Sequence, residues 1–326
     1  MKIIVTGATG FIGKNFLSTV KNDGNYYLCL IREESKIDDI EHFSNIEFKR
    51  IKFVQDELEE VMYGANVVIH MVGQMGGYGV TKEQFENANC KLTNDILQAC
   101  IVTKIKQLIY LSTPGVQGFG KRLCVESEPY APRNLYEKTK VESERMIINT
   151  LTGTEVKYTI LRPDFVYGPG DYRRIRMYKN IRDKKFVLTV SGKAYLNPTY
   201  VMDVVQGIKC SVGNIKGYDE IFNISSQYDI TVKEYLNVIA GSFSVPLIKI
   251  NIGHKLSVLC ALVIEKVYRI FLKKEGFVTK NQIDFLAMDH STSSEKAQKI
   301  LNYKPEYDFK QGFELTMKWC KKNRLL

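Results

Sequence analysis

The segment Met1-Lys2-Ile3-Ile4-Val5-Thr6-Gly7-Ala8-Thr9-Gly10-Phe11-Ile12-Gly13 decides the fold of this chain. Its first half is an apolar run, which fits a strand buried in a parallel sheet, and its second half is a glycine turn that leads into a helix. Glycine lets the backbone approach a pyrophosphate closely, and the following helix presents free N–H groups and the positive end of its dipole to the phosphates. The segment therefore predicts a dinucleotide site, with the spacing GxxGxxG in place of the more common GxGxxG.

The rest of the chain alternates apolar runs with amphipathic segments. The predicted strands are residues 2–6, 26–31, 46–53, 67–70, 107–112 and 157–162, and helical patterns such as 83–102 and 136–149 lie between them. This alternation indicates an α/β fold, a doubly wound parallel sheet. Because 326 residues exceed a typical single domain, a smaller second lobe is also expected.

A tyrosine and a lysine follow in the second half of this pattern. Tyr136 and Lys140 are four residues apart in a predicted helix, so they share one face of it. The ammonium group of Lys140 can then lie beside the phenol and favour the phenolate. This pairing predicts a tyrosine that acts as a base.

Together these segments resemble the extended short-chain dehydrogenase/reductase family, in particular its NAD-dependent epimerase/dehydratase type. The resemblance covers nearly the whole chain. The further matching segments are Val67-Val68-Ile69-His70-Met71-Val72-Gly73, Asn89, Tyr110-Leu111-Ser112-Thr113, Glu144, Leu161-Arg162-Pro163, Val166-Tyr167-Gly168-Pro169-Gly170, Val201-Met202-Asp203-Val204 and Trp319.

The resemblance implies a catalytic set of Thr113, Tyr136 and Lys140. Tyr136 would transfer a proton to or from a substrate oxygen while hydride passes between the substrate carbon and a nicotinamide. Lys140 would hold the nicotinamide ribose, and Thr113 would hydrogen-bond the same substrate oxygen. The cofactor-binding residues expected from the resemblance are Gly7, Thr9, Gly10, Phe11, Ile12, Gly13, Arg32, Met71, Val72, Gly73, Asn89, Tyr136, Lys140 and Pro163.

The end of the second predicted strand bears on the choice between NAD and NADP. An acidic residue there would bind the ribose 2′-hydroxyl of NAD, whereas Arg32 can pair with the 2′-phosphate of NADP. Glu33 and Glu34 follow and would repel that phosphate if they turned inward, and Arg32 can also stack on the adenine. Of the two cofactors, NADP is favoured.

Two further segments bear on the type of reaction and on the class of substrate. Pro114 and Gly115 follow Thr113, where sugar-nucleotide dehydratases of the family carry an acid pair, so dehydration is disfavoured. A 4-epimerase or a 4-keto-sugar reductase remains. The residues expected to bind a nucleoside-diphosphate sugar are Thr113 and Tyr136 together with Arg173, Arg174 and Arg176, whose guanidinium groups can clamp a diphosphate.

Two alternatives stay open. The apolar segment 256–272, and the sequence Tyr195-Leu196-Asn197-Pro198 where many sugar-nucleotide enzymes have an Arg-Asp pair, also fit a hydroxysteroid dehydrogenase or a flavonol-reductase-like enzyme. A redox sensor that binds a nucleotide without turnover is a third reading. The complete set of Thr113, Tyr136 and Lys140 speaks against that reading, because a sensor needs no proton-transfer group.

The resemblance also implies how the chain divides. We expect a dinucleotide-binding Rossmann domain at residues 1–163, to which residues 197–224 return, and an interleaved, smaller substrate lobe at 164–196 and 225–326. The family often forms homodimers through the helices around the tyrosine, so a homodimer is expected.

Composition restricts partners and location. A net charge of +10 suits a phosphorylated ligand, an anionic membrane face or ordinary solubility, and the spread of the basic residues argues against a nucleic-acid partner. Seven cysteines without a CxxC motif and four scattered histidines predict a reducing compartment and no metal site. No signal peptide is expected, because residues 6–13 form a glycine turn where a signal peptide needs an uninterrupted apolar region. Segment 256–272 is too short and too charged to span a bilayer, so no transmembrane segment and a cytoplasmic location are expected.

Overall fold

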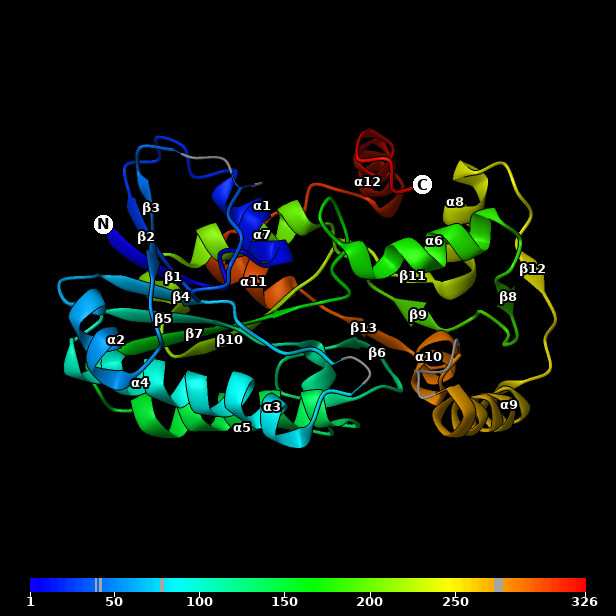
Figure 1. Ribbon diagram of the computed structural model, residues 1–326, viewed down its shortest axis with the longest axis horizontal. Coiled ribbons are helices and arrows are strands. Elements are labelled where there is room, and N and C mark those ends of the chain that lie inside the picture. Colours follow the sequence, from blue (N-terminus) through cyan, green and yellow to red (C-terminus); the bar gives the residue numbers. More distant parts are fainter. Residues whose placement is uncertain (39, 41–42, 77–78, 273–277) are drawn as a thin grey trace.

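The computed structural model describes residues 1–38, 40, 43–76, 79–272 and 278–326. Its centre is a parallel sheet of seven strands in the order β10-β7-β5-β4-β1-β2-β3 (Figure 1). The strands are β1 (Lys2–Thr6), β2 (Tyr26–Ile31), β3 (Ile46–Arg50), β4 (Val67–His70), β5 (Gln107–Leu111), β7 (Lys157–Pro163) and β10 (Glu220–Ile224). The predicted fold class is confirmed. The third strand ends at Arg50, three residues earlier than predicted.

Helices cover both faces of this sheet, as the apolar runs of its strands require. On one face lie α2 (Gln55–Met62), α4 (Leu92–Val102) and α5 (Leu135–Leu151), whose buried residues join those of the strands in one core cluster. The opposite face carries α1 (Phe11–Leu17), α7 (Val201–Ser211) and α11 (Glu295–Leu301). Figure 1 shows these two helical layers with the sheet between them.

The strand order reverses between β1 and β4. From β1 the chain moves outward through β2 to β3, then crosses to β4 on the other side of β1 and continues through β5 and β7. Ligands of open α/β sheets bind outside the carboxyl ends of the strands at such a point. Thr6 and His70, the last residues of the two strands, are paired across it.

A second group of elements lies beyond the carboxyl ends of the strands (Figure 1). Its helices are α6 (Ile175–Arg182), α8 (Val232–Ser242), α9 (His254–Val267), α10 (Lys280–Ala287) and α12 (Phe309–Lys322), and its strand pairs are β8 (Val187–Leu188) with β12 (Ile248–Lys249) and β9 (Tyr195–Leu196) with β11 (Ile230–Thr231). These elements share a third apolar core. The chain also pairs β6 (Lys121–Cys124) with β13 (His290–Thr292).

The chain passes between the two regions more than once. β10 joins the central sheet beside β7, and α7 and α11 both pack in the layer that covers it. The predicted division at 163, 197 and 224 stays a proposal. It assigns α11 to the substrate lobe, although Ala297 and Leu301 of this helix belong to the core on the sheet.

A buried ion pair fixes α5 to β7. Arg162 of β7 donates from Nε and Nη2 to the two carboxylate oxygens of Glu144 of α5, at 3.0 and 2.6 Å. Both side chains are at most 1% exposed. The Tyr130 hydroxyl also donates to Glu144 at 2.8 Å, so the buried carboxylate is well satisfied.

Removing one partner of this pair should destabilise the fold strongly. Arg162→Met leaves the Glu144 carboxylate buried without its cation, and we expect a loss of about 3–5 kcal/mol in the free energy of unfolding. The control is Lys299→Met, because Lys299 pairs with Glu295 at 3.1 Å with both side chains about three-quarters exposed; here we expect a change below about 1 kcal/mol. Urea denaturation measures both.

A double variant tests whether the loss of stability comes from the unpaired charge of Glu144. Arg162→Met with Glu144→Leu removes both charges, and much of the lost stability should return. An Arg162→Met variant as stable as the wild type would contradict the assigned role of the pair.

Candidate active site

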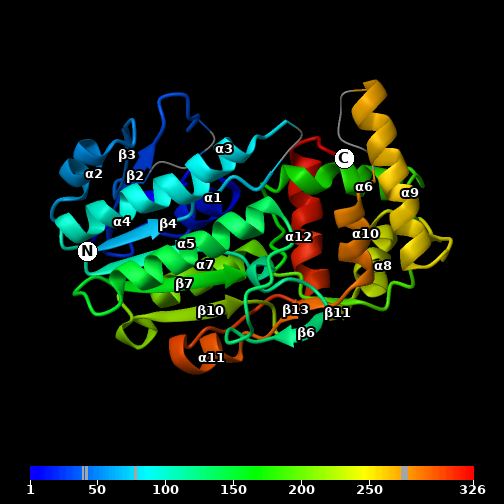
Figure 2. The ribbon, with the colours of Figure 1, turned by 90° about the horizontal axis from the view of Figure 1, so that it is seen from below.

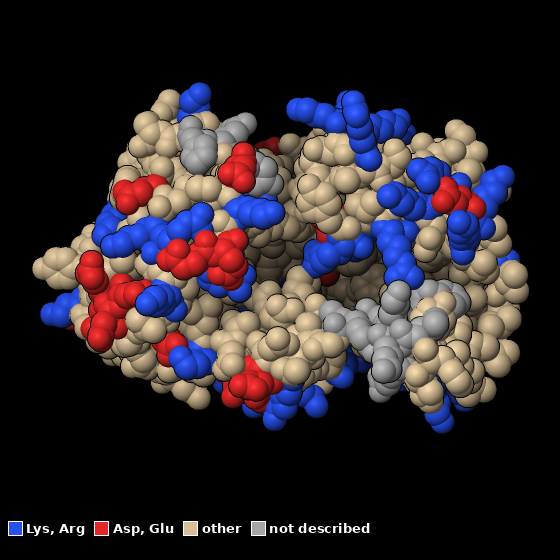
Figure 3. Space-filling model, viewed as in Figure 1, with Lys and Arg blue, Asp and Glu red and all other residues tan. Residues whose placement is uncertain are grey.

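One cavity of about 790 Å³ lies at the carboxyl ends of the central strands, and the second group of elements closes its other side. Figure 3 shows the molecule hollowed between these two regions. Among the predicted site residues, those that line it are Gly7, Gly10, Phe11, Ile12, Gly13, Met71, Val72, Gly73, Thr113, Tyr136, Lys140, Pro163, Arg173 and Arg174. The sheet thus brings together segments that are far apart in sequence.

The glycine turn is as tight as the sequence requires. Gly7 has φ +79°, and a Cβ there would lie 2.8 Å from the carbonyl carbon of Met71. A Cβ on Gly13 would lie 2.2 Å from the Gly7 carbonyl oxygen. Gly10 is the N-cap residue of α1 and has no side chain to cap the helix. The first N–H groups of the helix, which have no partner within it, therefore receive no side-chain cap.

The first turn of α5 carries the candidate base. Asn134 caps the helix by accepting a hydrogen bond from the Glu137 N–H at 2.9 Å, and Tyr136 is therefore held in the first turn, where it lines the cavity. Burial raises the pKa of Tyr136 to about 12, and the positive charge of Arg173 opposes this rise. A phenol in this setting is protonated at neutral pH.

Lys140 lies one turn further along α5 and is buried. Its Nζ donates to the Leu111 carbonyl at 2.6 Å and lies 4.1 Å from the centre of the Tyr110 ring. Burial lowers the pKa of Lys140 to about 7, although Glu144 and Cys90 oppose this fall. Arg173 adds a cation that the sequence analysis had not placed beside the phenol, since its charge lowers the pKa of Tyr136. The expected action of Lys140 on the same phenol stays a prediction.

Thr113 and its neighbour Ser112 lie where β5 ends. Thr113 caps a short 3₁₀ turn, Pro114–Gln117, and its hydroxyl accepts from the Gly115 N–H at 3.3 Å. Ser112 Oγ is buried and has no hydrogen-bond partner among the described residues. Both side chains line the cavity, so a ligand can use either hydroxyl.

A carboxylate also reaches this place, which the sequence analysis did not foresee. Glu137 lines the cavity, and a Cβ on Gly115 would lie 3.0 Å from its Oε1. Its two oxygens accept from Asn134 Nδ2 at 2.7 Å and from the Arg133 N–H at 2.6 Å. Glu137 therefore stabilises the start of α5 rather than standing free as a second acid.

Four predicted site residues lie outside the cavity lining: Thr9, Arg32, Asn89 and Arg176. Asn89 is buried behind the wall, where its side chain accepts from the Gln74 N–H at 2.7 Å and donates to Thr139 Oγ1 at 2.9 Å. It ties the loop after β4 to α5. Its hydrogen-bonding capacity is used within the protein, so its effect on a ligand would be indirect.

Arg32 and Arg176 are both on the surface. The Arg32 side chain is 73% exposed and pairs with Glu34 at 3.2 Å, and Arg176 is exposed on α6. Arg50 donates to the backbone carbonyls of Arg32 and Ser35, at 3.0 and 3.1 Å, and so holds the loop that carries Arg32. The sequence analysis had not singled out Arg50.

The predicted arginine cluster separates in space. Arg173 and Arg174 both pair with Asp171, through Nε atoms at 2.9 and 2.8 Å. Arg174 is further occupied, since it donates to the Val166 carbonyl at 2.6 Å and lies 4.0 Å from the centre of the Phe165 ring. Arg173 is half exposed at the cavity and is the cation best placed to meet a ligand.

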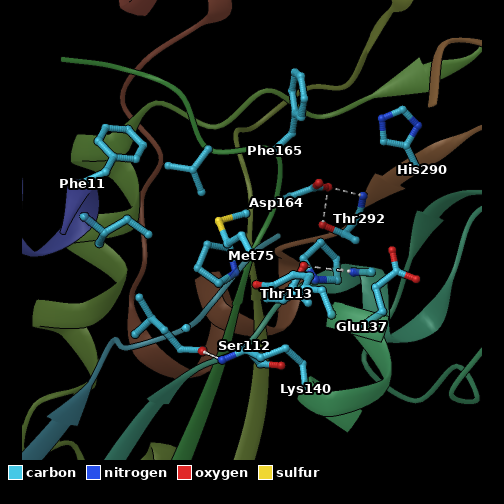
Figure 4. A pocket seen from close by; sticks show the side chains of 18 of the residues that line it. Phe11, Met75, Ser112, Thr113, Glu137, Lys140, Asp164, Phe165, His290 and Thr292 are labelled. Atoms are coloured by element: carbon cyan, nitrogen blue, oxygen red, sulfur yellow. Dashed lines mark hydrogen bonds between the residues drawn. The ribbon is translucent and has the colours of Figure 1, made fainter. Parts of the chain in front are cut away.

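The far end of the cavity is an aromatic wall that no sequence motif indicated. It consists of Phe119, Phe165, Phe285 and His290, with the rings of Phe285 and His290 centred 4.1 Å apart. Figure 4 shows Phe165 and His290 on the same side of the cavity. Burial lowers the pKa of His290 to about 4, so its ring is neutral at pH 7. These residues come from distant parts of the chain. The pairing of β6 with β13 brings Phe119 close to His290, and the hydrogen bonds from Thr292 to Asp164 hold the neighbouring Phe165 beside β13.

Asp164 is a second residue that the sequence analysis missed. It follows Pro163 at the end of β7, and its Oδ2 accepts from the Thr292 N–H and Oγ1 at 3.0 and 2.8 Å. Burial raises the pKa of Asp164 to about 7. In the sequence, only its position next to the Leu161-Arg162-Pro163 segment indicated that Asp164 could lie at the site.

Comparison with known proteins places this geometry in a family. Residues 3–225 match the model of the NAD dependent epimerase/dehydratase family. The chain belongs to this family. The predictions of the family and of an NAD(P)-dependent enzyme of the extended short-chain dehydrogenase/reductase type are confirmed.

Individual relatives of this chain are distant. An N-acetyl-alpha-D-glucosaminyl-diphospho-ditrans,octacis-undecaprenol 4-epimerase of Escherichia coli O157:H7 is 23% identical over 97% of this chain and 94% of its own. A 2-alkyl-3-oxoalkanoate reductase of Shewanella oneidensis is 24% identical, with coverage of 95% and 84%. The UDP-glucuronic acid 4-epimerase of Bacillus cereus, solved with UDP-glucuronic acid and NAD, superposes with a TM-score of 0.79 at 21% identity, over 99% of this chain and 100% of that one.

The residues present fit the nicotinamide cofactor of the family. The glycine turn and the start of α1, which has no side-chain cap, line one part of the cavity, and Lys140, Ser112 and Tyr136 supply polar groups further along it. No cluster of metal-ligating side chains occurs among the described residues, and none of the helices described is long and apolar enough to cross a membrane.

Proposed function

We propose that this enzyme changes the oxidation state of a hydroxyl-bearing carbon in a sugar carried on a diphosphate, as a 4-epimerase or a 4-keto-sugar reductase. The observation that carries the proposal is the single cavity that joins the glycine turn, Tyr136 and Arg173. The E. coli and B. cereus relatives, whose names specify sugars on diphosphates, support it. A bound nicotinamide cofactor would supply or accept the hydride.

Tyr136 is the proposed proton donor and acceptor. Its phenol is protonated at neutral pH, as a group that delivers a proton to a ketone oxygen must be. In the oxidative direction it has to accept a proton, so the positive charges around it matter. Arg173 provides one in the structure, and Lys140 would provide a second when protonated.

Lys140 and the two hydroxyls are proposed to position the reactants. With a pKa of about 7, Lys140 can change its protonation state when a ligand brings in negative charge. Ser112 or Thr113 would hydrogen-bond the substrate oxygen. Glu137 is engaged with the start of α5, so dehydration remains disfavoured.

Arg173 is the proposed contact for the diphosphate. Arg173 and Arg174 both pair with Asp171, but Arg173 is half exposed at the cavity, whereas Arg174 is mostly buried and also donates to the Val166 carbonyl. Arg176 lies outside the cavity lining. A charge-assisted hydrogen bond from a guanidinium to phosphate is among the stronger polar contacts in proteins.

The aromatic wall favours a second candidate, reduction or oxidation of an apolar ketone or alcohol. Phe119, Phe165 and Phe285 offer a surface suited to a hydrocarbon ring or chain, and the S. oneidensis relative is named as a reductase of 2-alkyl-3-oxoalkanoates. The same Tyr136 chemistry applies. A hydroxysteroid or flavonol-like substrate belongs to this candidate.

Arg173→Ala separates the two candidates. For a diphosphate-linked sugar we expect KM to rise by the equivalent of about 1.5–3 kcal/mol, the range for a hydrogen bond to a charged group. An apolar substrate without phosphate should be nearly unaffected. Steady-state kinetics on UDP-, dTDP-, GDP- and CDP-sugars and on hydroxysteroids measure this.

The matched control is Arg176→Ala, which removes the same charge outside the cavity and should change neither KM. Sugar-nucleotide kinetics that do not respond to loss of Arg173 would contradict the contact. A protein that binds nicotinamide but turns over no member of either panel would support the redox-sensor reading.

We further propose that NADP is the preferred cofactor. Arg32 stands at the end of β2, and its exposed side chain can leave Glu34 to pair with a 2′-phosphate. Arg32→Asp should then shift preference toward NADH, and Glu34→Gln should tighten NADPH binding by freeing the guanidinium. Titration of both cofactors measures this, and a wild-type preference for NADH would remove the proposal.

The assembly and location stay predictions. A homodimer through the helices around Tyr136 is tested by light scattering in solution, and the cytoplasmic location by fractionation of cells that make the protein.

A further inference from the structure

Helix α9 exposes its large apolar side chains. Seven residues of α9 and the π-helical turn after it, Tyr268–Leu272, form what we call the α9 face, and each is between 44 and 77% exposed: Leu256, Leu259, Leu262, Val263, Val267, Ile270 and Phe271. The two residues of α9 that are fully buried are small, Ser257 and Ala261, and Val258 is partly buried against the third core. This is the reverse of an ordinary surface helix, which turns its large apolar side chains inward.

The exposed apolar residues are concentrated here. With Ile250 and Ile252, which precede the helix, this region holds nine of the 22 exposed large hydrophobic side chains that the described residues contain. Scattered exposed leucines need no explanation, but a contiguous apolar surface marks an interaction site.

The charges beside the α9 face are positive. Lys255 and Lys266 are exposed on α9. Glu265 is the sole acidic residue in the sequence between 250 and 272, and it accepts a hydrogen bond from the Lys280 N–H at 3.3 Å. Apolar side chains combined with lysines fit an anionic lipid surface, whereas a second copy of this face would bring like charges together.

The position of α9 connects this surface to the cavity. α10 packs directly against α9, and Figures 1 and 2 show the two helices side by side at the end of the molecule farthest from β3. α10 contributes Gln282 and Phe285 to the cavity wall. A surface seated on α9 would therefore lie one helix away from the aromatic end of the cavity.

We propose that the α9 face docks on the surface of an anionic lipid bilayer and holds the aromatic end of the cavity beside the lipid headgroups. The helix lies in the interface and does not cross it, since none of the helices described is long and apolar enough to span a bilayer and α9 carries the charged residues Glu265 and Lys266. The docking does not depend on the proposed function. Only its consequence, access to a diphosphate sugar carried on a lipid, rests on it.

Flotation with vesicles tests the docking. Wild-type protein should float with vesicles of phosphatidylcholine mixed with phosphatidylglycerol, less with phosphatidylcholine alone, and less at high salt. Leu259→Glu with Val263→Glu should lower the partition coefficient by at least about tenfold, because both substitutions place charge in the apolar contact.

The matched control is Val102→Glu with Ile215→Glu, two exposed apolar residues outside the α9 face that receive the same charge change. This variant should bind vesicles like the wild type. Wild-type protein that stays with the soluble fraction, or an α9 double variant that floats as well as the control, would overturn the proposal. So would light scattering that reveals a dimer dissolved by the α9 substitutions without any vesicle binding.

Turnover of a water-soluble sugar nucleotide, measured without vesicles, keeps the docking and the proposed function apart. The α9 double variant should retain wild-type turnover, which also reports that it is folded. Vesicle binding without turnover of any sugar would contradict the proposed function and leave the docking intact. Turnover of a sugar without vesicle binding would contradict the docking and leave the proposed function intact.

Discussion

The geometry of the site depends on the buried pair between Arg162 and Glu144. The pair joins α5, which carries Tyr136 and Lys140, to β7, whose end leads into Pro163 and Asp164 at the cavity. Two charges out of contact with water must stay paired, so α5 cannot slide along β7 without a large cost in free energy. The position of the candidate base relative to the sheet is thereby fixed before any ligand binds.

Burial shifts the pKa values of two site residues in opposite directions. It raises the pKa of the Tyr136 phenol and lowers that of the Lys140 ammonium, so both groups lean toward their neutral forms without a ligand. Negative charge from a bound ligand would favour protonated Lys140, and Arg173 already favours the phenolate. The residues that bind a charged substrate can therefore also tune the group that exchanges its proton.

Much of this arrangement follows from local sequence. Runs that alternate with amphipathic segments predicted six of the seven sheet strands. Five of these runs are apolar because their strands are buried in the sheet, whereas the edge strand β3 is partly exposed. The spacing of Tyr136 and Lys140 placed them on one helix. Contacts between residues far apart in the sequence could not be predicted. No sequence pattern connects His290 with Phe165, which come together because Thr292 of β13 hydrogen-bonds Asp164. Arg173 and Arg176 look equivalent in the sequence, but only Arg173 lines the cavity.

The central claim is that Tyr136 exchanges the proton while hydride leaves or enters the substrate carbon in the same cavity. Rapid mixing of cofactor-loaded enzyme with a turned-over substrate, followed by the near-ultraviolet absorbance of reduced nicotinamide, tests it most directly. Tyr136→Phe should keep its affinity for the cofactor and lose at least about a hundredfold in the rate of the absorbance change, the low end for positioned acid–base catalysis. An unchanged rate in the variant would contradict the account.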